Sequence, residues 1–555
     1  MKAFLSKEFS STHEAAVLLA VFSLFSQILA LVRDKLLAYM FGAGAVLDTY
    51  YAAFRVPDLI YALLASAFAS VVIVPTLMGI VEEKGEESMR RFSGAIFKAF
   101  FVLMCAVSVI LFFLMPYIVP FSAPGFTAAA QSDVVMLSRI LLLSPLLLGL
   151  SNLFGSVAQM RRHFWFVAMA PVFYNIGIIA GIVLLYPVLG LSGLAWGVAL
   201  GALLHLFTQG TEARRSPAAP DFSAPLSFKE LRGLFKISLP RMFTLSLSQI
   251  LLLCFTAIAS TLSLGSVAIF TFAFNLQSVP LALIGMSYST AAFPSLSSFF
   301  AKKDKIGFSK EMHSALAQII FWSVVVTCFF IVLRAHIVRV ILGAGAFSWN
   351  DTRLTAAALA VFIFSILAQN AMMLFTRGYY ALKDTKTPLL LHGFSSVVSV
   401  GFAFLFLYLF KTAESFRFFI DDLLRVDGVQ GTAVLMLPLA YSVGAIMGAV
   451  LLSFDLARKN FLSLKNIYKT FLQVFGASLL GAYASYLFLD SLSGPFGLTT
   501  FWGVFGQGAV AGIGGAAISA LFLIVLDNAE FKRILTVFRH KFWRGRALVP
   551  EQTEL

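Results

Sequence analysis

Charged residues gather in two very apolar segments near the start of the chain, between Ser26 and Pro75. They are Arg33, Asp34, Lys35, Asp48, Arg55 and Asp58. The apolar segments elsewhere are almost free of charge. A charge at membrane depth costs at least about 2.5–3.5 kcal/mol on insertion scales, so it persists only where it faces water, a partner or a ligand. The stretch therefore predicts a hydrated cavity for a charged substrate.

The spacing of these residues indicates which of them share a helix face. Gln27 and Asp34 are seven residues apart, and so are Asp48 and Arg55, so each pair shares one face of a helix. Both faces could line one cleft between the first two helices. A guanidinium matches phosphate bidentately. We therefore expect Arg33 and Arg55 to hold an anionic head group, and Asp34 and Asp48 to orient these arginines or to form gating pairs.

The same charges could instead mark helix ends near the outer interface, without any ligand. We favour this interpretation for Lys35 and Asp58, and the cavity for Arg33 and Arg55. Arg139 begins the fourth apolar segment. Snorkelling of its side chain to the membrane interface explains this arginine as well as a functional role does.

Other polar residues inside the apolar segments favour structural roles. We expect interhelical hydrogen bonds rather than ligand contacts from the uncharged ones. They are Asn175, Gln249, Asn275, Gln277, Gln369 and Asn370. His205 and His392 lack metal-ligand spacing and are expected to be satisfied core residues. The three cysteines, Cys105, Cys254 and Cys328, lie far apart and predict neither a disulfide nor a metal site.

The composition is that of a polytopic membrane protein. Of 555 residues, 59% are hydrophobic and only 12% are charged, and the mean hydropathy is +0.90, whereas soluble proteins carry about 25% charged residues. The net charge of +14 fits lysines and arginines in cytoplasmic loops better than binding to nucleic acid. The first apolar run lacks a small-residue cleavage site, so we expect a full-length helix and not a cleaved signal peptide.

Enzyme signatures do not rise above background in the sequence. There is no P-loop, no HExxH and no GxSxG motif, and the aspartate-rich motifs of membrane enzymes that bind diphosphates through Mg²⁺ are lacking. We therefore predict no enzyme, no cofactor and no metal site.

The apolar segments predict about fourteen membrane-spanning helices. They run over roughly 14–40, 46–80, 93–120, 133–159, 164–187, 190–210, 234–262, 265–298, 311–340, 354–380, 388–410, 430–456, 468–489 and 500–526. With the N-terminus inside, most lysines and arginines fall in cytoplasmic segments. The outer segments hold only Arg334, Arg339, Arg353, Lys411, Arg417 and Arg425. This alternation predicts an even number of spans with both termini cytoplasmic.

A polar break divides the helical region into two comparable parts. The segment from Gly210 to Leu231 carries three prolines and mixed charge, and predicts a cytoplasmic linker over 211–232. It separates a first lobe, 1–210, from a second, 233–459, and six spans in each give a parallel repeat. Helices 13 and 14, within 460–528, lie outside the repeat. The basic cytoplasmic tail, 529–555, could bind a partner or lie on anionic lipid.

Several segments resemble one known family. The stretch VRDKLLAYMFGAGAVLDTYYAAFRVPDLI is similar to the opening signature of the MurJ/MviN family of lipid II flippases. Further similar segments are HFWFVAMAPVFYNIGII (163–179), GLAWGVALGALL (193–204), LPRMFTLSLSQILLL (239–253), FPSLS (293–297) and TRGYYALKDTKTP (376–388). The resemblance implies the fold of the multidrug, oligosaccharidyl-lipid and polysaccharide exporters (the MOP superfamily). In that all-α fold, two six-helix lobes surround a central cavity, and helices 13 and 14 form a groove for a lipid tail.

The resemblance also implies a function in peptidoglycan biosynthesis and cell shape. It implies a flippase of the bacterial cytoplasmic (inner) membrane. This flippase would move the undecaprenyl-diphosphate-linked precursor lipid II from the cytoplasmic to the outer leaflet by alternating access. Lipid II, membrane lipids and cell-wall synthases are the implied partners. The alternatives are a flippase of the same fold for another polyprenyl-linked glycan, a membrane glycosyltransferase and a drug/ion antiporter.

Residue by residue, the resemblance assigns substrate binding to Arg33, Arg55, Gln27 and Asn275. Arg33 matches a cavity arginine of the family, and Arg55 keeps a basic residue where lysine is common. Other residues occupy the usual arginine and acidic positions: Gln27, Tyr61, Ala62, Ser66 and Asn275. Because helices 7 and 11 contain no Asp or Glu, the resemblance does not support the sodium site known in some members.

Overall fold

The computed structural model describes residues 12–65, 70–161, 163–215, 219–223, 228–465, 467–492 and 500–543, and the single residues 225, 494 and 497. These residues form α-helices with a few π and 3-10 turns, and no β-strand occurs among them. The all-helical class expected from the sequence is confirmed. Ser66, the end of the basic tail from residue 544 and several residues of the predicted linker lie outside the described residues.

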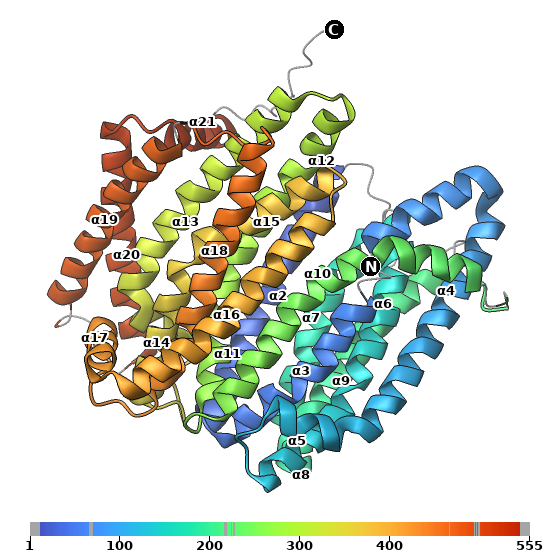
Figure 1. Ribbon diagram of the computed structural model, residues 1–555, viewed down its shortest axis with the longest axis horizontal. Helices are drawn as coiled ribbons and strands as arrows, with labels where there is room; N and C mark the ends of the chain where they lie inside the picture. The colour runs from blue at the N-terminus through green and yellow to red at the C-terminus, as the bar shows by residue number, and fades with distance from the viewer. Residues whose placement is uncertain are drawn as a thin grey trace. The chain divides into compact units, whose positions relative to one another are not determined.

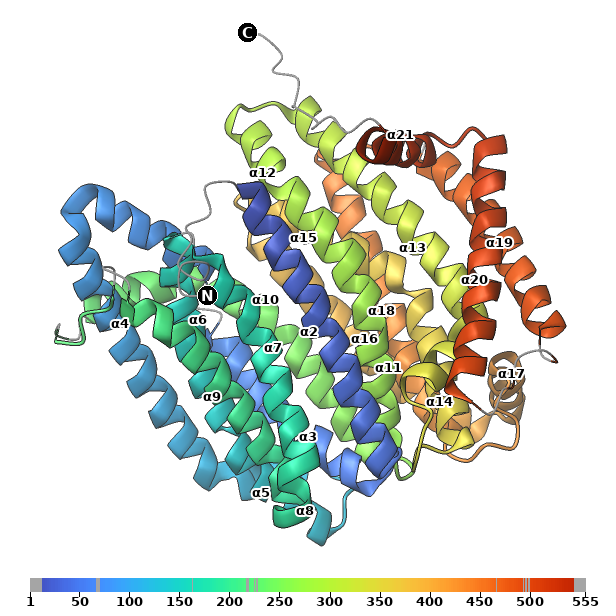
Figure 2. The same ribbon diagram turned by 180° about the vertical axis from the view of Figure 1, so that it is seen from behind.

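The chain divides into two compact units, each built from several stretches. The first comprises Met1–Phe272, Ile341–Ala358 and His392–Tyr441. The second comprises Ala273–Val340, Leu359–Leu391 and Ser442–Leu555. The colour ramp of Figures 1 and 2 locates these stretches along the ribbon.

Most helices of the first unit come from its long N-terminal stretch. They are α2 (Thr12–Phe41), α3 (Ala45–Ala65), α4 (Ser70–Ser122), α5 (Ala128–Leu141), α6 (Leu143–Met160), α7 (Phe164–Ala180), the π-helical turn η2 (Gly181–Leu185), α8 (Tyr186–Leu189), α9 (Leu191–Arg215) and α10 (Phe228–Ser260). Two short elements follow much later, α17 (Glu414–Leu424) and the 3-10 turn η4 (Thr432–Leu435). Of the predicted linker, residues 211–215 belong to α9 and residues 228–232 to α10.

The remaining helices belong to the second unit or continue from one unit into the other. Those of the second unit are η3 (Leu281–Met286, π-helical), α12 (Ser287–Ala301), α13 (Lys305–Ile341, up to Val340), α15 (Ile366–Ala381), α19 (Ile467–Ser491), α20 (Phe501–Val525) and α21 (Ala529–Trp543). Those shared by the two are α11 (Ser266–Pro280), α14 (Trp349–Phe364), α16 (Lys386–Thr412) and α18 (Met436–Arg458).

The described residues do not confirm the predicted number of fourteen membrane spans. By length and apolar composition the described residues contain 11 spanning helices, or 12 if the bent pair α14 and α15 forms one span. Neither α2 nor α3 is among them. These two helices carry the charged residues noted in the sequence. The count of fourteen is therefore not confirmed, whereas the many-span membrane class is.

Helix α4 contains a sharp bend at Gly85. The backbone of Gly85 has φ 79° and ψ 174°, far from helical values. Glycine reaches positive φ at little cost because it lacks a Cβ atom. The bend separates a short N-terminal arm from the long apolar arm of α4, and the ribbon turns sharply there (Figure 1).

Helix α7 and the turn η2 that continues it pack closely on α9 through facing glycines, and both ribbon views place α7 and α9 side by side (Figures 1 and 2). A Cβ atom on Gly181 would lie 2.4 Å from the Cα of Gly197, and one on Gly177 would lie 2.3 Å from the Cα of Gly201. No real side chain fits at these distances. The close approach explains the repeated glycines in these apolar segments, and it fixes α7, whose other side packs on α2.

Helices α19 and α20 form a tight hairpin in the second unit. The Ser485 hydroxyl donates to the Ala511 carbonyl at 2.9 Å, and the Ser519 hydroxyl donates to the Ala477 carbonyl at 3.0 Å. A Cβ atom on Gly481 would lie 2.4 Å from the Gly515 carbonyl oxygen. These two helices are the pair that the sequence places outside the repeat.

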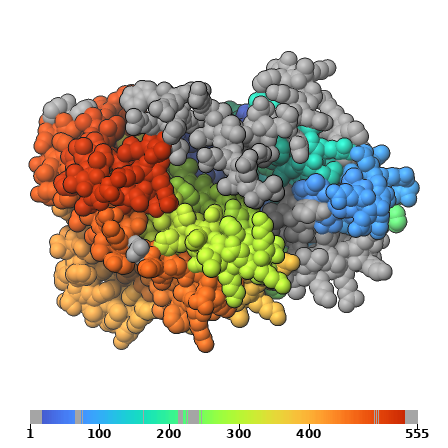
Figure 3. Space-filling model, turned by 90° about the horizontal axis from the view of Figure 1, so that it is seen from above, coloured from blue at the N-terminus to red at the C-terminus, as the bar shows by residue number. Residues whose placement is uncertain are grey.

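Helix α21 crosses the end of the second unit and is attached to α13. Glu530 is buried and accepts a hydrogen bond from the Gln318 amide. The rings of Phe531 and Phe321 stack with centroids 6.3 Å apart. From above, the red surface of the C-terminal segment adjoins the yellow-green surface of residues near 300 (Figure 3). The described start of the basic tail is therefore an anchored helix.

Candidate functional site

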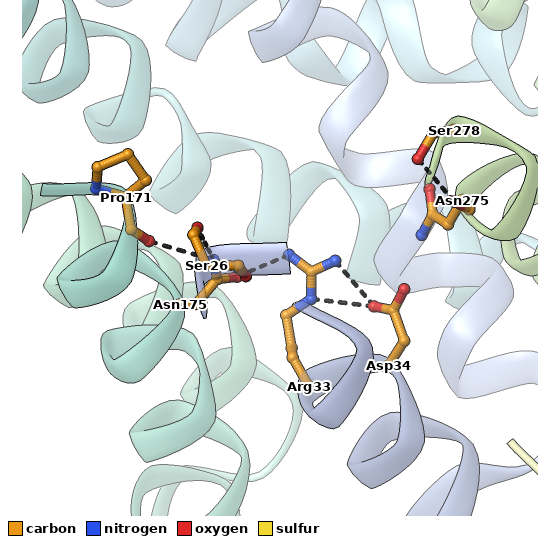
Figure 4. A network of polar contacts seen from close by, with 7 residues as sticks. All are labelled: Ser26, Arg33, Asp34, Pro171, Asn175, Asn275 and Ser278. Carbon is orange, nitrogen blue, oxygen red and sulfur yellow. Dashed lines mark hydrogen bonds and ion pairs between the residues drawn. The ribbon is translucent and has the colours of Figure 1, made fainter. Parts of the chain in front are cut away.

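Arg33 on α2 is held by an ion pair with its neighbour in the chain. Its Nε and Nη2 atoms donate to Asp34 Oδ1 at 3.0 and 2.8 Å (Figure 4). The Arg33 side chain is 21% exposed and the Asp34 side chain 6%. The carboxylate therefore fixes the guanidinium and balances its charge, while part of the arginine stays accessible. This contact agrees with the orienting role expected for Asp34, and that role stays a prediction.

Asn175 on α7 provides the second contact of Arg33. Its Oδ1 atom accepts from Arg33 Nη1 at 3.4 Å. Its Nδ2 atom donates to the Ser26 hydroxyl at 3.1 Å and to the Pro171 carbonyl at 3.1 Å (Figure 4). Because these acceptors fix the amide nitrogen, the amide oxygen faces the guanidinium. Asn175 thus makes the interhelical bond expected from the sequence, and it also positions Arg33.

Arg55 on α3 is buried among hydroxyl groups. Its side chain donates to Thr256 Oγ1 on α10 at 2.7 Å and to Thr271 Oγ1 on α11 at 3.1 Å, and the residue is 8% exposed. Within the described part of the chain its guanidinium makes no ion pair. A guanidinium has five N–H donors, and two of them meet these threonines. The positive charge is therefore held in place without being neutralised by direct contact with a carboxylate.

Asp48 binds backbone amides instead of an arginine. Its Oδ2 atom accepts from the Gly265 amide at 2.7 Å, and its Oδ1 atom accepts from the Ala268 amide at 2.8 Å. The residue is 3% exposed. These amides lie at the start of α11, where N–H groups lack intrahelical partners and the helix dipole favours a negative charge. The geometry makes Asp48 a cap that joins α3 to α11. The gating role predicted for it stays untested.

The two uncharged residues of the predicted site lie in different units. Gln27 is half-buried on α2, two turns before Asp34. Asn275 lies on the part of α11 that belongs to the second unit, and its carbonyl oxygen accepts from the Ser278 hydroxyl at 2.6 Å (Figure 4). Contact of Gln27 and Asn275 with a substrate stays a prediction.

A small cavity lined by Asp58, one turn after Arg55 on α3, was not expected from the sequence. It has a volume of about 100 Å³ and lies between α3, α5, α6 and α7. Its polar lining residues are Asp58, Tyr61, Ser144 and Tyr174. From the sequence we expected Asp58 to mark a helix end, whereas it lies inside α3. The spacing of Asp58 and Tyr61, three apart on one helix, was the only signal of a shared face.

The uncharged polar residues of the second unit form the interhelical bonds that the sequence predicts. Gln369 Nε2 donates to Gln277 Oε1 at 3.1 Å, joining α15 to α11. Asn370 Nδ2 donates to the Ser323 hydroxyl on α13 at 2.8 Å. In the first unit, His205 Nδ1 lies 2.7 Å from the Ser151 hydroxyl, as expected for a satisfied core histidine.

The conspicuous motif TRGYYALKDTKTP forms a polar cluster at the loop between α15 and α16. The Tyr379 hydroxyl donates to Asp455 Oδ2 at 2.5 Å, and the Lys459 ammonium lies 2.7 Å from the same oxygen. Asp384 accepts from the Thr387 hydroxyl at 2.6 Å. Partial burial raises the pKa of Asp384, but hydrogen bonds from Thr387 and the charge of Lys459 lower it, and the net pKa lies below its ordinary value. The cluster ties this loop to the end of α18.

Many apolar spans and buried arginines held by polar partners define a polytopic helical membrane transporter. A family model described as "Lipid II flippase MurJ" matches residues 37–504. The chain therefore belongs to this family, and the family prediction made from the opening signature is confirmed.

Individual relatives and solved structures agree with this assignment. The chain is 26% identical over 379 residues to the probable lipid II flippase MurJ of Rhizobium tropici, covering 66% of this chain and 70% of the relative. The lipid II flippase MurJ of Burkholderia cenocepacia is 26% identical over 375 residues, covering 66% and 73%. An inward-closed structure of lipid II flippase MurJ matches with a TM-score of 0.73 at 22% identity, covering 92% of this chain and 99% of the other. An inward-facing multidrug transporter of the MATE family and MOP superfamily matches with a TM-score of 0.65 at 15% identity, covering 82% and 99%. These two likenesses show a shared fold.

Proposed function

We propose that this protein is a flippase that moves lipid II from the cytoplasmic to the outer leaflet by alternating access. The observation that carries the proposal is the family match over residues 37–504, together with two buried or half-buried arginines, Arg33 and Arg55, on the helices of the opening signature. We place the protein in the bacterial inner membrane with both termini cytoplasmic, and assign it no catalytic chemistry.

The two arginines suit a diphosphate. Arg33 is only partly exposed and keeps its geometry through Asp34 and Asn175. Two N–H groups of Arg55 donate to neutral threonine hydroxyls, so its positive charge is available to an anion. Charge-assisted hydrogen bonds contribute about 1.5–3 kcal/mol each. The loss of either arginine should therefore weaken diphosphate binding by about 10- to 100-fold.

The proposed division of labour follows the sequence repeat. Residues 1–210 and 233–459 form the two lobes, and 460–528 contain the helix pair that would accommodate the polyprenyl tail. The membrane potential is a sufficient driving force in principle, because moving one charge through 100 mV is worth about 2.3 kcal/mol. Cell-wall synthases that consume lipid II on the outer face are the expected protein partners.

A second candidate is a flippase of the same fold for another polyprenyl-linked glycan. Tyr61 and Asn275, at positions where the family commonly has arginine, favour this alternative. Both substrates share the diphosphate, so Arg33 and Arg55 would serve either one. The two candidates differ in the sugar and peptide that the protein must accept.

Complementation of a lipid II flippase depletion strain separates the two candidates. The wild-type chain should restore growth when the resident flippase is depleted, and the Arg33→Ala variant at equal membrane abundance should not. Arg139→Ala is the matched control, because Arg139 donates to the Phe112 carbonyl at 2.9 Å and lies over the Phe112 ring. Failure of an abundant wild-type chain would reject lipid II in favour of another glycan lipid.

A further inference from the structure

The small cavity lined by Asp58 contains a set of oxygen donors with one negative charge. Asp58 supplies a carboxylate, and Tyr61, Ser144 and Tyr174 supply hydroxyls. Four helices of the first unit contribute its wall, with Phe54, Pro57, Leu141, Pro145 and Leu148 as apolar neighbours. A carboxylate at membrane depth is costly unless a proton, a cation or a partner compensates its charge.

A hydrogen bond at the cavity orients the hydroxyl of Tyr61. Tyr61 Oη accepts a hydrogen bond from Asn152 Nδ2 at 2.6 Å. Ser144 is buried, at 7% exposed, and it lines the cavity together with Tyr174. Asp58 and Tyr61 lie three residues apart on α3, and both line the cavity with Tyr174. Carboxylate and hydroxyl oxygens therefore converge on one small space.

The cation nearest to Asp58 is engaged elsewhere. Arg55 lies one turn earlier on α3 and donates to Thr256 and Thr271. The described residues contain no ion pair that involves Asp58. The arginine thus attracts the carboxylate through space but does not saturate its oxygens, which leaves them available to a second positive charge.

The size and chemistry of the cavity limit the occupant. Water takes up about 30 Å³ per molecule in the liquid, so about 100 Å³ holds a small cation with some of its water. Oxygen-only donors suit a hard cation. A divalent ion usually draws several carboxylates, whereas this cavity offers one, and the described residues contain no cluster of three His, Cys, Asp or Glu. A small monovalent cation fits this donor set.

We propose that Asp58, Tyr61, Ser144 and Tyr174 form a binding site for Na⁺ in the first unit. In the proposed function, this site and the arginines act on the same step, the binding of the substrate diphosphate. Na⁺ bound at Asp58, one turn from Arg55 on α3, raises the local positive charge and so increases the affinity for the diphosphate. By linkage, the bound diphosphate increases the affinity for Na⁺ by the same factor. That coupling rests on the proposed function, whereas Na⁺ binding itself does not.

The test is the thermal stability of the purified full-length protein in detergent, without any lipid-linked substrate. NaCl, KCl and choline chloride are compared at constant ionic strength. Na⁺ should raise the melting temperature in proportion to the logarithm of its concentration above the dissociation constant. Asp58→Asn should abolish this Na⁺-specific shift. Asp422→Asn, which removes an exposed carboxylate on α17, should leave it unchanged.

A second variant keeps the test decisive if Asp58→Asn fails to fold. Ser144→Ala removes one oxygen and retains the carboxylate, so half-saturation should need about 10-fold more Na⁺. Equal stabilisation by the three salts, or a full Na⁺ response in Asp58→Asn, would overturn the proposal. A response to pH without a response to Na⁺ would assign the carboxylate to a proton and would equally reject a Na⁺ site. A failed flipping assay does not bear on these results.

Discussion

Replacing Asp48 by alanine should destabilise the protein and leave the affinity for substrate nearly unchanged. The structure gives the reason, because both carboxylate oxygens accept backbone amides at the start of α11, at 2.7 and 2.8 Å, in a site that is 3% exposed. Alanine would leave two buried N–H groups without acceptors. Each such group costs about 1–3 kcal/mol, and partial hydration of the vacated space reduces the sum, so we expect a loss of about 2–4 kcal/mol.

The variant Asp48→Asn should show an intermediate loss of stability. Asp48→Asn keeps one acceptor oxygen and loses the charge that favours the helix N-terminus, so it should cost about half as much as alanine. Thermal and denaturant-induced unfolding of the purified proteins measure the loss, with the exposed Asp422→Ala as control. Flipping per folded molecule should stay within about two-fold of wild type, since a cap contributes no substrate contact. Wild-type stability combined with lost flipping in Asp48→Ala would refute this reasoning and restore the gating role.

Four further expectations concern other parts of the molecule. Arg33→Ala should reduce the flipping rate by about 100-fold. Arg33→Lys should reduce it by about 10-fold, because lysine keeps the positive charge but lacks the planar guanidinium. Initial flipping rates at equal protein content measure the two effects. Asn175→Ala should reduce flipping only about 5-fold, since it loosens Arg33 and removes no charge, and a loss equal to that of Arg33→Ala would mean that Asn175 itself contacts substrate. Asp384 stabilises the protein above the ordinary carboxyl pKa of 3.8 and loses this effect as the pH falls through its lower folded value. Asp384→Asn should therefore lower the melting temperature at pH 7, and this difference should shrink as the pH falls below 3.8. A difference that stays constant with pH would contradict the assignment. Gly197→Leu should prevent close packing against Gly181, whose Cα would lie 2.4 Å from the new Cβ. It should therefore lower the yield of folded protein in size-exclusion chromatography. A wild-type elution profile and melting temperature would refute the glycine contact.

The fold was largely predictable because membrane helices leave strong signals in a sequence. Long apolar segments, the lysine and arginine bias and the opening signature together indicated an all-helical transporter. The number of spans was less accessible. Segments 14–40 and 46–80 were expected to span the membrane, yet α2 and α3 carry the charges of the candidate site and neither is among the spanning helices of the described residues.

The candidate site was predictable only in part, because charge reveals a residue and not its partner. The cost of a charge at membrane depth singled out Arg33 and Arg55. The partners of Arg55, Thr256 and Thr271, lie about 200 residues away along the chain and are ordinary threonines in apolar helices. Asp48 had the same kind of signal as Asp34, yet it binds backbone amides, which have no sequence signature. Long-range pairing decides such roles, and periodicity does not encode it.

Flipping of fluorescent lipid II in proteoliposomes tests the central claim most directly. The purified chain is reconstituted at a fixed ratio to lipid, and a membrane-impermeant quencher reports the labelled lipid in the outer leaflet over time. We expect flipping by wild type, by Arg55→Lys and by the control Arg139→Ala, and a loss of at least about 10-fold in Arg33→Ala and Arg55→Ala. Equal rates in all five proteins, or no flipping by a folded wild-type chain, would contradict this expectation.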